Sequence, residues 1–469
     1  MFGPLGTKAA RQTLLIAAAW CFSSFPSGAG SFQRLRGVAE ILLAAPADSD
    51  EHSPRVSKRL GPDSFLGVLG GVCLSGLATR SSALGLRLAD QDPLATARGN
   101  AFAATADNPS AIYYNPAGLT QLEGHHLRIG AYAVALDSHF TSPTGARFDT
   151  KSRVDFAPQL YYAYGMKEQP LAFGLGLYAP YGLALEWPNN AEFGLTYGKM
   201  THLSLNPVVA WQPHPTLSVA AGLTLNYCDT EIRQEAVRNL PGAANGVNRF
   251  QGDDTDAGYN FGLLWQPFKQ HSVGVNYRSP TTMSLRGTGT ISGTGLIDGT
   301  GPASARLPFP RHVVLGYSFR PTPEWNFEFN ADWTEWSRLT TVTFQQFTGP
   351  TAVPFNWRSS WFYEFGATRR FEGGWRASAG YIFSENSVPA GSFSPLVPDS
   401  DRHIFSLGLG RQQARVSWDV AYQLAWGPSR GVSGNALAVP VAFGPPAASA
   451  NGRYTFLSHA ITAALGIRF

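Results

Sequence analysis

The chain is constrained most by an alternation of apolar and polar residues that has a period of two and runs from His125 to the last residue. This period indicates β-strands, because successive side chains of a strand point to opposite faces. In segment 325–334 one face is aromatic or apolar, and the other carries amides, hydroxyls and carboxylates. The apolar set is Trp325, Phe327, Phe329, Ala331 and Trp333, and the polar set is Asn326, Glu328, Asn330, Asp332 and Thr334. A soluble core cannot satisfy both sets, so we predict an all-β protein whose strands face lipid outside and a wet lumen inside.

The composition disfavours a soluble enzyme and a nucleic-acid-binding protein. Charged residues make up 14% of the chain, whereas soluble domains average about 25%. The mean hydropathy is −0.11, and beyond residue 82 the chain lacks the run of about 18 apolar residues that a membrane-spanning helix needs. The formal net charge is only +4, without a basic tract, so no nucleic-acid partner is indicated.

Turn residues divide the alternating region into fourteen predicted strands, an even number that closes a transmembrane antiparallel β-barrel. Short and long connections alternate, as expected for tight periplasmic turns and long extracellular loops. Tryptophans lie beside the predicted turns and rims, which is typical of a membrane interface. The predicted strands are 125–138, 153–166, 170–186, 198–212, 217–233, 250–267, 271–290, 306–320, 325–346, 356–371, 375–386, 402–412, 414–428 and 453–469. We therefore predict one barrel domain over 125–469.

The carboxyl end of the chain is consistent with this class of protein. The last predicted strand alternates and closes on an aromatic residue, Phe469. This arrangement resembles the assembly signal of outer-membrane barrels. We expect the barrel-assembly machinery to bind it.

The amino-terminal part predicts export. Residues 55–82 contain basic residues, then an apolar stretch, then small residues, as a secretory signal peptide does. We interpret 1–54 as a non-native N-terminal extension from a mis-assigned start, with an unusual genuine leader as the alternative. Cys21 and Cys73 fall in these segments, which leaves Cys228 alone and excludes a disulfide framework and a thiolate metal site.

Residues 83–124 differ from the rest of the chain. They are rich in small residues and are broken by Asp92-Pro93, Asn108-Pro109 and Asn115-Pro116. The residue before a proline favours extended or turn geometry. Because the segment is long for a linker and too polar to span lipid, we predict a compact plug, or hatch, inside the lumen.

The run ADNPSAIYYNPAGL in this segment resembles the FadL-type outer-membrane transporters, which carry long-chain fatty acids or aromatic hydrocarbons. The resemblance extends from about residue 83 to residue 469. It implies a fourteen-stranded barrel with an N-terminal hatch, in which Asn115, Pro116, Ala117 and Gly118 would lie. A shift of these residues would open a path for substrate. Without the resemblance, they would indicate only a turn.

The family also implies a break in the third strand that opens a lateral exit. That strand reads LAFGLGLYAPYGLALEW, and Ala179, Pro180, Tyr181 and Gly182 interrupt it. Pro180 cannot donate to a ladder, and Gly182 tolerates a kink. We predict a lateral portal at these four residues, with an ordinary bulge near the rim as the alternative.

These features together predict a channel in the bacterial outer membrane for passive uptake of a hydrophobic compound, such as a long-chain fatty acid. The substrate would bind in an apolar groove at the outer mouth, pass a moving hatch and leave through the wall. We expect Trp187, Phe193, Leu195 and Tyr197 to shape the groove. Candidate cations for a substrate carboxylate are Arg233, Arg238 and Arg249. The expected partners are the substrate, outer-membrane lipid and the assembly machinery, and we expect a monomer.

Two other classes of function stay open at this point. One is a general porin or adhesin, and the other is an outer-membrane lipid-modifying enzyme. The residues disfavour an enzyme: no catalytic, metal or cofactor motif stands out. His125 and His126 are adjacent on a strand, where neighbouring side chains point to opposite faces and cannot easily share a metal.

Overall fold

The computed structural model describes residues 86–189, 193–237, 241–435 and 450–469. The predicted extension 1–54, the predicted signal peptide 55–82 and residues 83–85 of the predicted hatch lie outside the described residues. Among the helices of the described part, none is both long and apolar enough to cross a bilayer.

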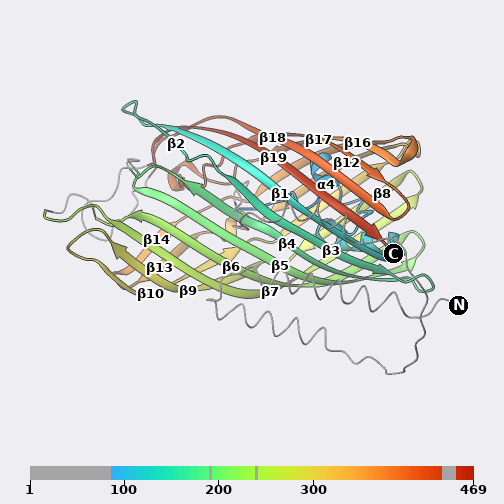
Figure 1. The fold of residues 1–469 in the computed structure, drawn as a ribbon, viewed down its shortest axis with the longest axis horizontal. Helices are drawn as coiled ribbons and strands as arrows, with labels where there is room; N and C mark the ends of the chain where they lie inside the picture. Colours follow the sequence, from blue (N-terminus) through green and yellow to red (C-terminus); the bar gives the residue numbers. More distant parts are fainter. Residues whose placement is uncertain (1–85, 190–192, 238–240, 436–449) are drawn as a thin grey trace, which may run out of the picture. The chain divides into compact units, whose positions relative to one another are not determined.

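The described strands form a single antiparallel sheet that closes on itself (Figure 1), because β19 (Gly452–Arg468) pairs with β1 (Gly124–Thr141). Around the wall, the strands are β1, β3 (Val154–Gly165), β4 (Leu171–Glu186), β5 (Leu195–His214), β6 (Leu217–Glu235), β7 (Val247–Phe268), β8 (His271–Arg278) continued by β9 (Thr281–Ser292), β10 (Gly299–Phe309) continued by β11 (His312–Phe319), β12 (Trp325–Thr334), β15 (Ser360–Arg370), β16 (Trp375–Ser384), β17 (Arg402–Gln412), β18 (Val416–Val432) and β19. Counting each continued strand once, the described wall has 14 strands, which confirms the predicted barrel.

Local sequence explains where the strands differ from the predicted boundaries. Pro280 and Pro310 lie at the breaks between β8 and β9 and between β10 and β11, and proline cannot donate to a ladder. The predicted strand 325–346 stops at Thr334, where a short 3-10 helix, η3 (Trp336–Arg338), turns the buried Trp336 inward. The chain then forms a hairpin at the rim from β13 (Thr341–Gln346) and β14 (Gly349–Pro354). Another short strand, β2 (Arg147–Asp149), pairs antiparallel with residues 139–141 of β1 and forms a second hairpin.

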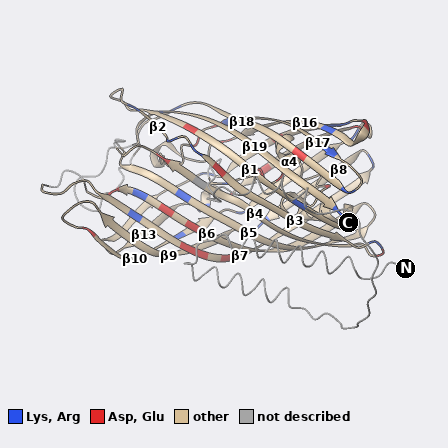
Figure 2. Ribbon diagram, viewed as in Figure 1, with Lys and Arg blue, Asp and Glu red and all other residues tan. Residues whose placement is uncertain are grey.

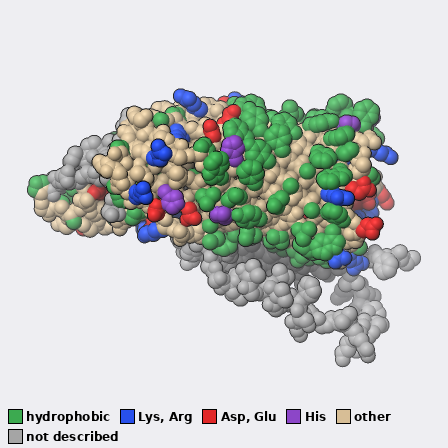
Figure 3. All heavy atoms as spheres, turned by 90° about the horizontal axis from the view of Figure 1, so that it is seen from above, with side chains coloured by type: hydrophobic (Ala, Val, Ile, Leu, Met, Phe, Trp, Pro, Cys, Tyr) green, Lys and Arg blue, Asp and Glu red, His purple; other side chains and the backbone are tan. Residues whose placement is uncertain are grey.

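The two faces of the wall differ as the alternation predicts. On β12, Phe327 and Phe329 are exposed, while Glu328 and Asp332 on the other face are buried. Figure 3 shows hydrophobic side chains over much of the outer wall. Figure 2 shows few charges along most strands, with a concentration on β6 and β7. The buried carboxylates correct one expectation: at this level they contact the N-terminal segment rather than facing an open, wet lumen.

Residues 86–124 fold inside the barrel, where Figure 1 shows them between the strands. The segment contains the helix α4 (Pro93–Ala97), the helix α5 (Ala111–Tyr114) and the 3-10 helix η2 (Pro116–Gln121). Contacts join α4 to β16, β17, β18 and β19, whereas η2 contacts β3 to β7. The segment thus bridges opposite sides of the lumen. Two further 3-10 turns, η4 (Glu372–Gly374) and η5 (Ala390–Ser392), lie in connections between wall strands.

Candidate functional site

Three buried ion pairs hold residues 86–124 to the barrel. Arg87 binds Asp332 on β12 in a bidentate manner, with N–O distances of 2.8 and 2.6 Å. Arg98 binds Glu328 at 3.3 Å. In the third pair the segment supplies the carboxylate and the barrel supplies the cation: Asp92 pairs with Arg128 of β1. Removing one partner of a buried pair costs about 3–5 kcal/mol, so these contacts hold the segment strongly in this position.

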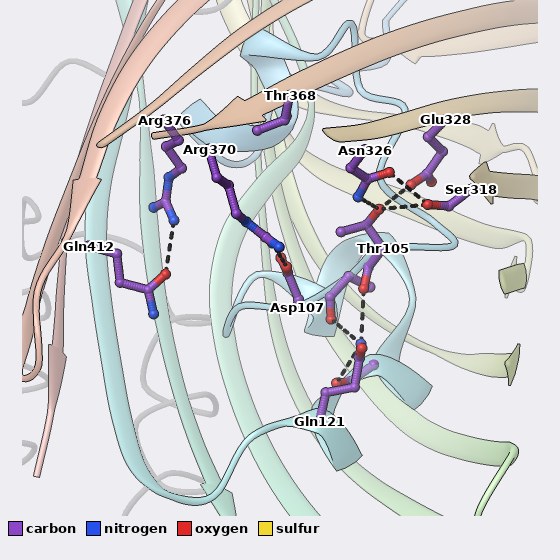
Figure 4. Close-up of polar contacts among 12 residues, drawn as sticks. Thr105, Asp107, Gln121, Ser318, Asn326, Glu328, Thr368, Arg370, Arg376 and Gln412 are labelled. Carbon is purple, nitrogen blue, oxygen red and sulfur yellow. Dashed lines mark hydrogen bonds and ion pairs between the residues drawn. The ribbon is translucent and has the colours of Figure 1, made fainter. Parts of the chain in front are cut away.

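A cluster around Thr105 anchors the middle of the segment (Figure 4). The Glu328 carboxylate accepts hydrogen bonds from the Ala104 amide, at 2.7 Å, and from the Thr105 hydroxyl. Asn326 donates to the same hydroxyl at 2.9 Å. Gln121 closes the segment on itself by donating to the Thr105 carbonyl at 2.9 Å. The polar face of β12 is therefore used to bind this segment.

The predicted hatch residues form a compact element that is docked on β7. Asn115 caps η2 by accepting from the Ala117 amide, and its own amide donates to Leu263 of β7 at 2.9 Å. Pro116 occupies the first turn of η2, where its missing N–H is not needed. A Cβ on Gly118 would lie 2.2 Å from the Ala106 carbonyl oxygen, so only glycine fits this approach. The element is thus more than an isolated turn.

The predicted portal residues lie where two neighbouring wall strands separate. β3 and β4 pair only between 159–165 and 172–178. Beyond these residues, β3 continues on β1 and β4 continues on β5, while in the described wall no ladder joins β3 to β4. The register of β4 on β5 shifts between Tyr178 and Tyr181, so Ala179 and Pro180 form a bulge at this point. One edge of β4 is left without a strand partner on the wall.

Residues 86–91 cover that edge from inside, and we call them the sealing segment. The Leu88 amide donates to the Pro180 carbonyl at 2.8 Å, and the Gly182 amide donates to the Leu86 carbonyl at 2.9 Å. The Gln91 side chain donates to the Ala179 carbonyl at 2.7 Å. The exposed polar backbone of β4, which lipid could not satisfy, is satisfied in this way.

An apolar pocket lies between the sealing segment and the long loops. Its volume is about 130 Å³. The lining includes Leu86 of the sealing segment, aliphatic and aromatic side chains of β5, β6, β7, β9, β10 and the β13–β14 hairpin, and residues 393–397. An apolar cavity of about 150 Å³ is known to hold one benzene molecule, so this pocket can hold a ligand of comparable size.

The four residues predicted to shape the mouth have different positions. Leu195 lines the pocket. Trp187 and Phe193 are fully buried beside it, and the Trp187 indole donates to the Pro395 carbonyl at 2.9 Å. Tyr197 is buried under the guanidinium of Arg233. Trp187 therefore supports the loop that covers the pocket rather than contacting its interior.

Two of the three candidate cations, Arg233 and Arg249, do not face the pocket. Arg233 and Arg249 both pair with Glu231, at 2.6 and 2.8 Å. These three residues lie on the strand face opposite to the pocket-lining Ile232. The structure thus gives Arg233 and Arg249 no contact with a ligand in the pocket. Arg238 lies outside the described residues.

Sequence reasoning missed the residues that complete the pocket. Leu86 and residues 393–397 come from segments without regular periodicity. They meet in the pocket although hundreds of residues separate them in the sequence. The only local signal was the apolar content of SFSPLVPDS, which is unusual for an exposed loop. His125 and His126 do not meet: His125 hydrogen-bonds Tyr162 and His126 hydrogen-bonds Glu123. Among the described residues, no group of three metal-ligating side chains occurs.

Comparison with known proteins completes this description. The sequence profile of the outer membrane protein transport protein family (OMPP1/FadL/TodX) matches residues 74–469. The chain belongs to this family. A long-chain fatty acid transport protein of Escherichia coli O6:H1 is 24% identical over 350 residues, which cover 65% of this chain and 78% of that protein. The 47 kDa outer membrane protein of Pasteurella multocida is 24% identical over 384 residues, which cover 74% of this chain and 89% of that protein.

Solved structures share the fold. A Pseudomonas aeruginosa FadL homologue superposes with a TM-score of 0.73 at 18% identity, covering 82% of this chain and all of that one. The Ralstonia pickettii toluene transporter TbuX superposes with a TM-score of 0.64 at 18% identity, and the match covers 80% of this chain and 98% of that one. Membership of this family confirms the resemblance predicted from the sequence, the outer-membrane location and the transport class. It sets aside the lipid-modifying enzyme.

Proposed function

We propose that this FadL-family protein is a passive channel that takes up a hydrophobic compound from the outer surface and releases it sideways into the membrane. The observation that carries the proposal is the double role of the sealing segment. Its Leu86 forms part of the pocket, and its backbone covers the open edge of β4. Displacement of this one segment would therefore connect the pocket to the gap between β3 and β4.

The proposed steps of uptake follow from the solvents that the ligand meets, which are water at the outer surface and lipid beyond the barrel wall. An apolar ligand binds in the pocket because it leaves water there. When the sealing segment moves, Ala179, Pro180, Tyr181 and Gly182 become the rim of a lateral portal. The ligand then enters lipid without passing through water. Asn115, Pro116, Ala117 and Gly118 belong to the hatch that blocks the direct route to the periplasm.

The substrate is a hydrophobic small molecule. Relatives named as long-chain fatty acid transport proteins and structural neighbours named as toluene transporters support this class. We also propose that the barrel works as a monomer in outer-membrane lipid, and that the assembly machinery recognises the terminal Phe469. The described barrel closes within one chain, so a partner subunit is not needed to cover a free sheet edge.

A disulfide tests the route. Leu88 and Pro180 lie directly opposite each other in the short antiparallel pairing, so the double variant Leu88→Cys/Pro180→Cys can be oxidised to fix the sealing segment to β4. In intact cells, whose lipopolysaccharide leaflet slows the entry of hydrophobic compounds, uptake of labelled toluene should fall on oxidation to the level of cells without the protein and return on reduction. Each single-cysteine variant serves as a control. Unchanged flux through the oxidised protein would overturn lateral release.

A second cross-link shows which part moves. A Cβ on Gly316 would lie 3.1 Å from the Cβ of Ala103 and 2.5 Å from the Oδ1 atom of Asn330, so Ala103→Cys/Gly316→Cys can join the hatch to β11 far from the gap once the Asn330 side chain shifts. If the sealing segment moves alone, this bond leaves flux unchanged. If flux also stops, the whole hatch must shift.

A further inference from the structure

The mostly apolar lining of the pocket includes three hydroxyl side chains and three amides, Gln234, Asn248 and Gln346, and two of these amides carry an unpaired oxygen. Asn248 of β7 is only 5% exposed, and its Oδ1 atom has no hydrogen-bond partner. Gln346, at the end of β13, is half-buried, and its Oε1 atom also has no hydrogen-bond partner. Both residues line the pocket. Buried polar atoms are nearly always hydrogen-bonded, so unpaired amide oxygens in this pocket point to a ligand that carries a hydrogen-bond donor.

The two amides belong to the same region of the pocket wall. A Cβ on Gly289 would lie 3.0 Å from the Gln346 oxygen, so this oxygen lies over β9 at Gly289. The register partner of Gly289 on β7 is Phe250. Phe250 is two residues from Asn248 on the same strand face, a separation of about 7 Å along the strand. Between the amides, the rings of Phe250 and Phe344 pack edge to face at 5.1 Å.

From this arrangement we infer that the pocket selects an uncharged hydrophobic compound with one hydroxyl group, such as an aromatic or aliphatic alcohol. The inference rests on the proposed function, because it takes the pocket as the substrate site. The apolar body of the ligand packs among the aliphatic side chains and the Phe250–Phe344 pair. Its hydroxyl donates its one proton to the Oδ1 atom of Asn248, the more deeply buried of the two amide oxygens, and its oxygen accepts from the side-chain NH2 group of Gln346.

The surrounding charges favour a neutral ligand over a carboxylate. The described side chains that line the pocket include no Lys, Arg, His, Asp or Glu. The nearby Arg233 and Arg249 are paired with Glu231 on the opposite strand face. A carboxylate in the pocket would lose its hydration without gaining a counter-ion, which is unfavourable in an apolar site.

Three ligands with the same seven carbons test the inference: toluene, benzyl alcohol and benzoate. Equilibrium binding is measured to the full-length protein in detergent. We expect benzyl alcohol to bind about tenfold more tightly than toluene, because a net hydrogen bond is worth about 1.4 kcal/mol, which is a factor of ten. Benzoate should bind most weakly. Toluene binding equal to or tighter than that of the alcohol, or tightest binding of benzoate, would overturn the inference.

Variants assign the effect to the amides. Asn248→Leu should abolish the preference for benzyl alcohol over toluene, and the heat-modifiable band on gels shows independently that the variant is folded. Gln346→Leu should act in the same direction. Asn189→Leu, at an exposed loop position, is the matched control and should keep the preference. A preference that survives in both pocket variants would refute the role of the amides.

The failure of the inference differs from the failure of the proposed function. Leu285 lines the pocket, so Leu285→Trp should fill it and abolish binding of all three ligands. If filling the pocket removes binding and flux but the wild type shows no preference for the alcohol, only the inference is wrong. If filling the pocket leaves flux unchanged, the proposed function is wrong as well.

Discussion

The ion pair between Arg87 and Asp332 offers the sharpest test of how the gap is sealed. Arg87 belongs to the sealing segment, and its guanidinium makes two short bonds to Asp332 at 2.8 and 2.6 Å. Both side chains are almost fully buried. Replacing Asp332 by Asn leaves the shape nearly unchanged but removes the negative charge. The perturbation therefore weakens the seal without altering the edge of β4.

The size of the effect of Asp332→Asn on the open population follows from the burial of the ion pair. An uncompensated buried charge costs about 3–5 kcal/mol, and each 1.4 kcal/mol is a factor of ten. We therefore expect Asp332→Asn to raise the population of the open segment by roughly 100-fold or more. Glu364 lines the same small cavity of about 10 Å³ and can offset part of the lost charge. The double variant Asp332→Asn/Glu364→Gln removes this compensation and should show the larger effect.

Hydrogen exchange at two backbone amides measures the opening directly. The Leu88 and Gly182 amides form the bonds that join the sealing segment to β4, so their exchange should accelerate by that factor. Flux of toluene should rise in parallel. The matched control is Glu335→Gln, because the Glu335–Arg311 pair at 2.8 Å is partly exposed and worth no more than about 1 kcal/mol. Unchanged exchange at both amides in the double variant would refute the reasoning.

Three further predictions concern other parts of the molecule. Gly118→Ala should loosen the hatch by about 1–3 kcal/mol, because the new Cβ would lie 2.2 Å from a backbone oxygen; protease cleavage within 86–124 measures this, and Gly431→Ala, with open space around it, should have no effect. Phe469→Ala should lower the yield of membrane-assembled barrel in cells, read as the heat-modifiable band on gels; Phe268→Ala, an equally exposed residue beside a short turn, should not, and equal losses would contradict the assembly role. Leu285→Trp should reduce uptake of toluene by intact cells, measured above the uptake of cells without the protein, at least tenfold while the barrel keeps its heat-modifiable band, because the indole occupies a pocket of about 130 Å³.

Much of the wall could be predicted from the sequence because the information is local. Each strand carries its own period of two, and Phe327 and Glu328 show which faces meet lipid and lumen without reference to any other strand. The hatch could be located because X-Pro pairs and small residues set it apart. The irregularity of β4 at Ala179-Pro180 could also be predicted from the sequence, since proline removes a ladder hydrogen bond wherever it lies. The use of these positions as hatch and portal stays a prediction.

The sequence by itself determined the number of wall strands, their faces and the segment that fills the lumen, because backbone geometry fixes the side-chain period within each strand; it did not determine where the predicted strands 271–290, 306–320 and 325–346 break or end. Only the tertiary structure decided the contacts inside the barrel. Arg87 and Asp332 are 245 residues apart, and nothing local pairs them. Closure of the barrel brings Leu86 of the sealing segment and Phe393 of a loop to Asn248 of β7 in one pocket, and strand register turns Arg233 and Arg249 away from it. A shift of one residue in register would exchange these faces, which is why the site depends on closure of the barrel as a whole.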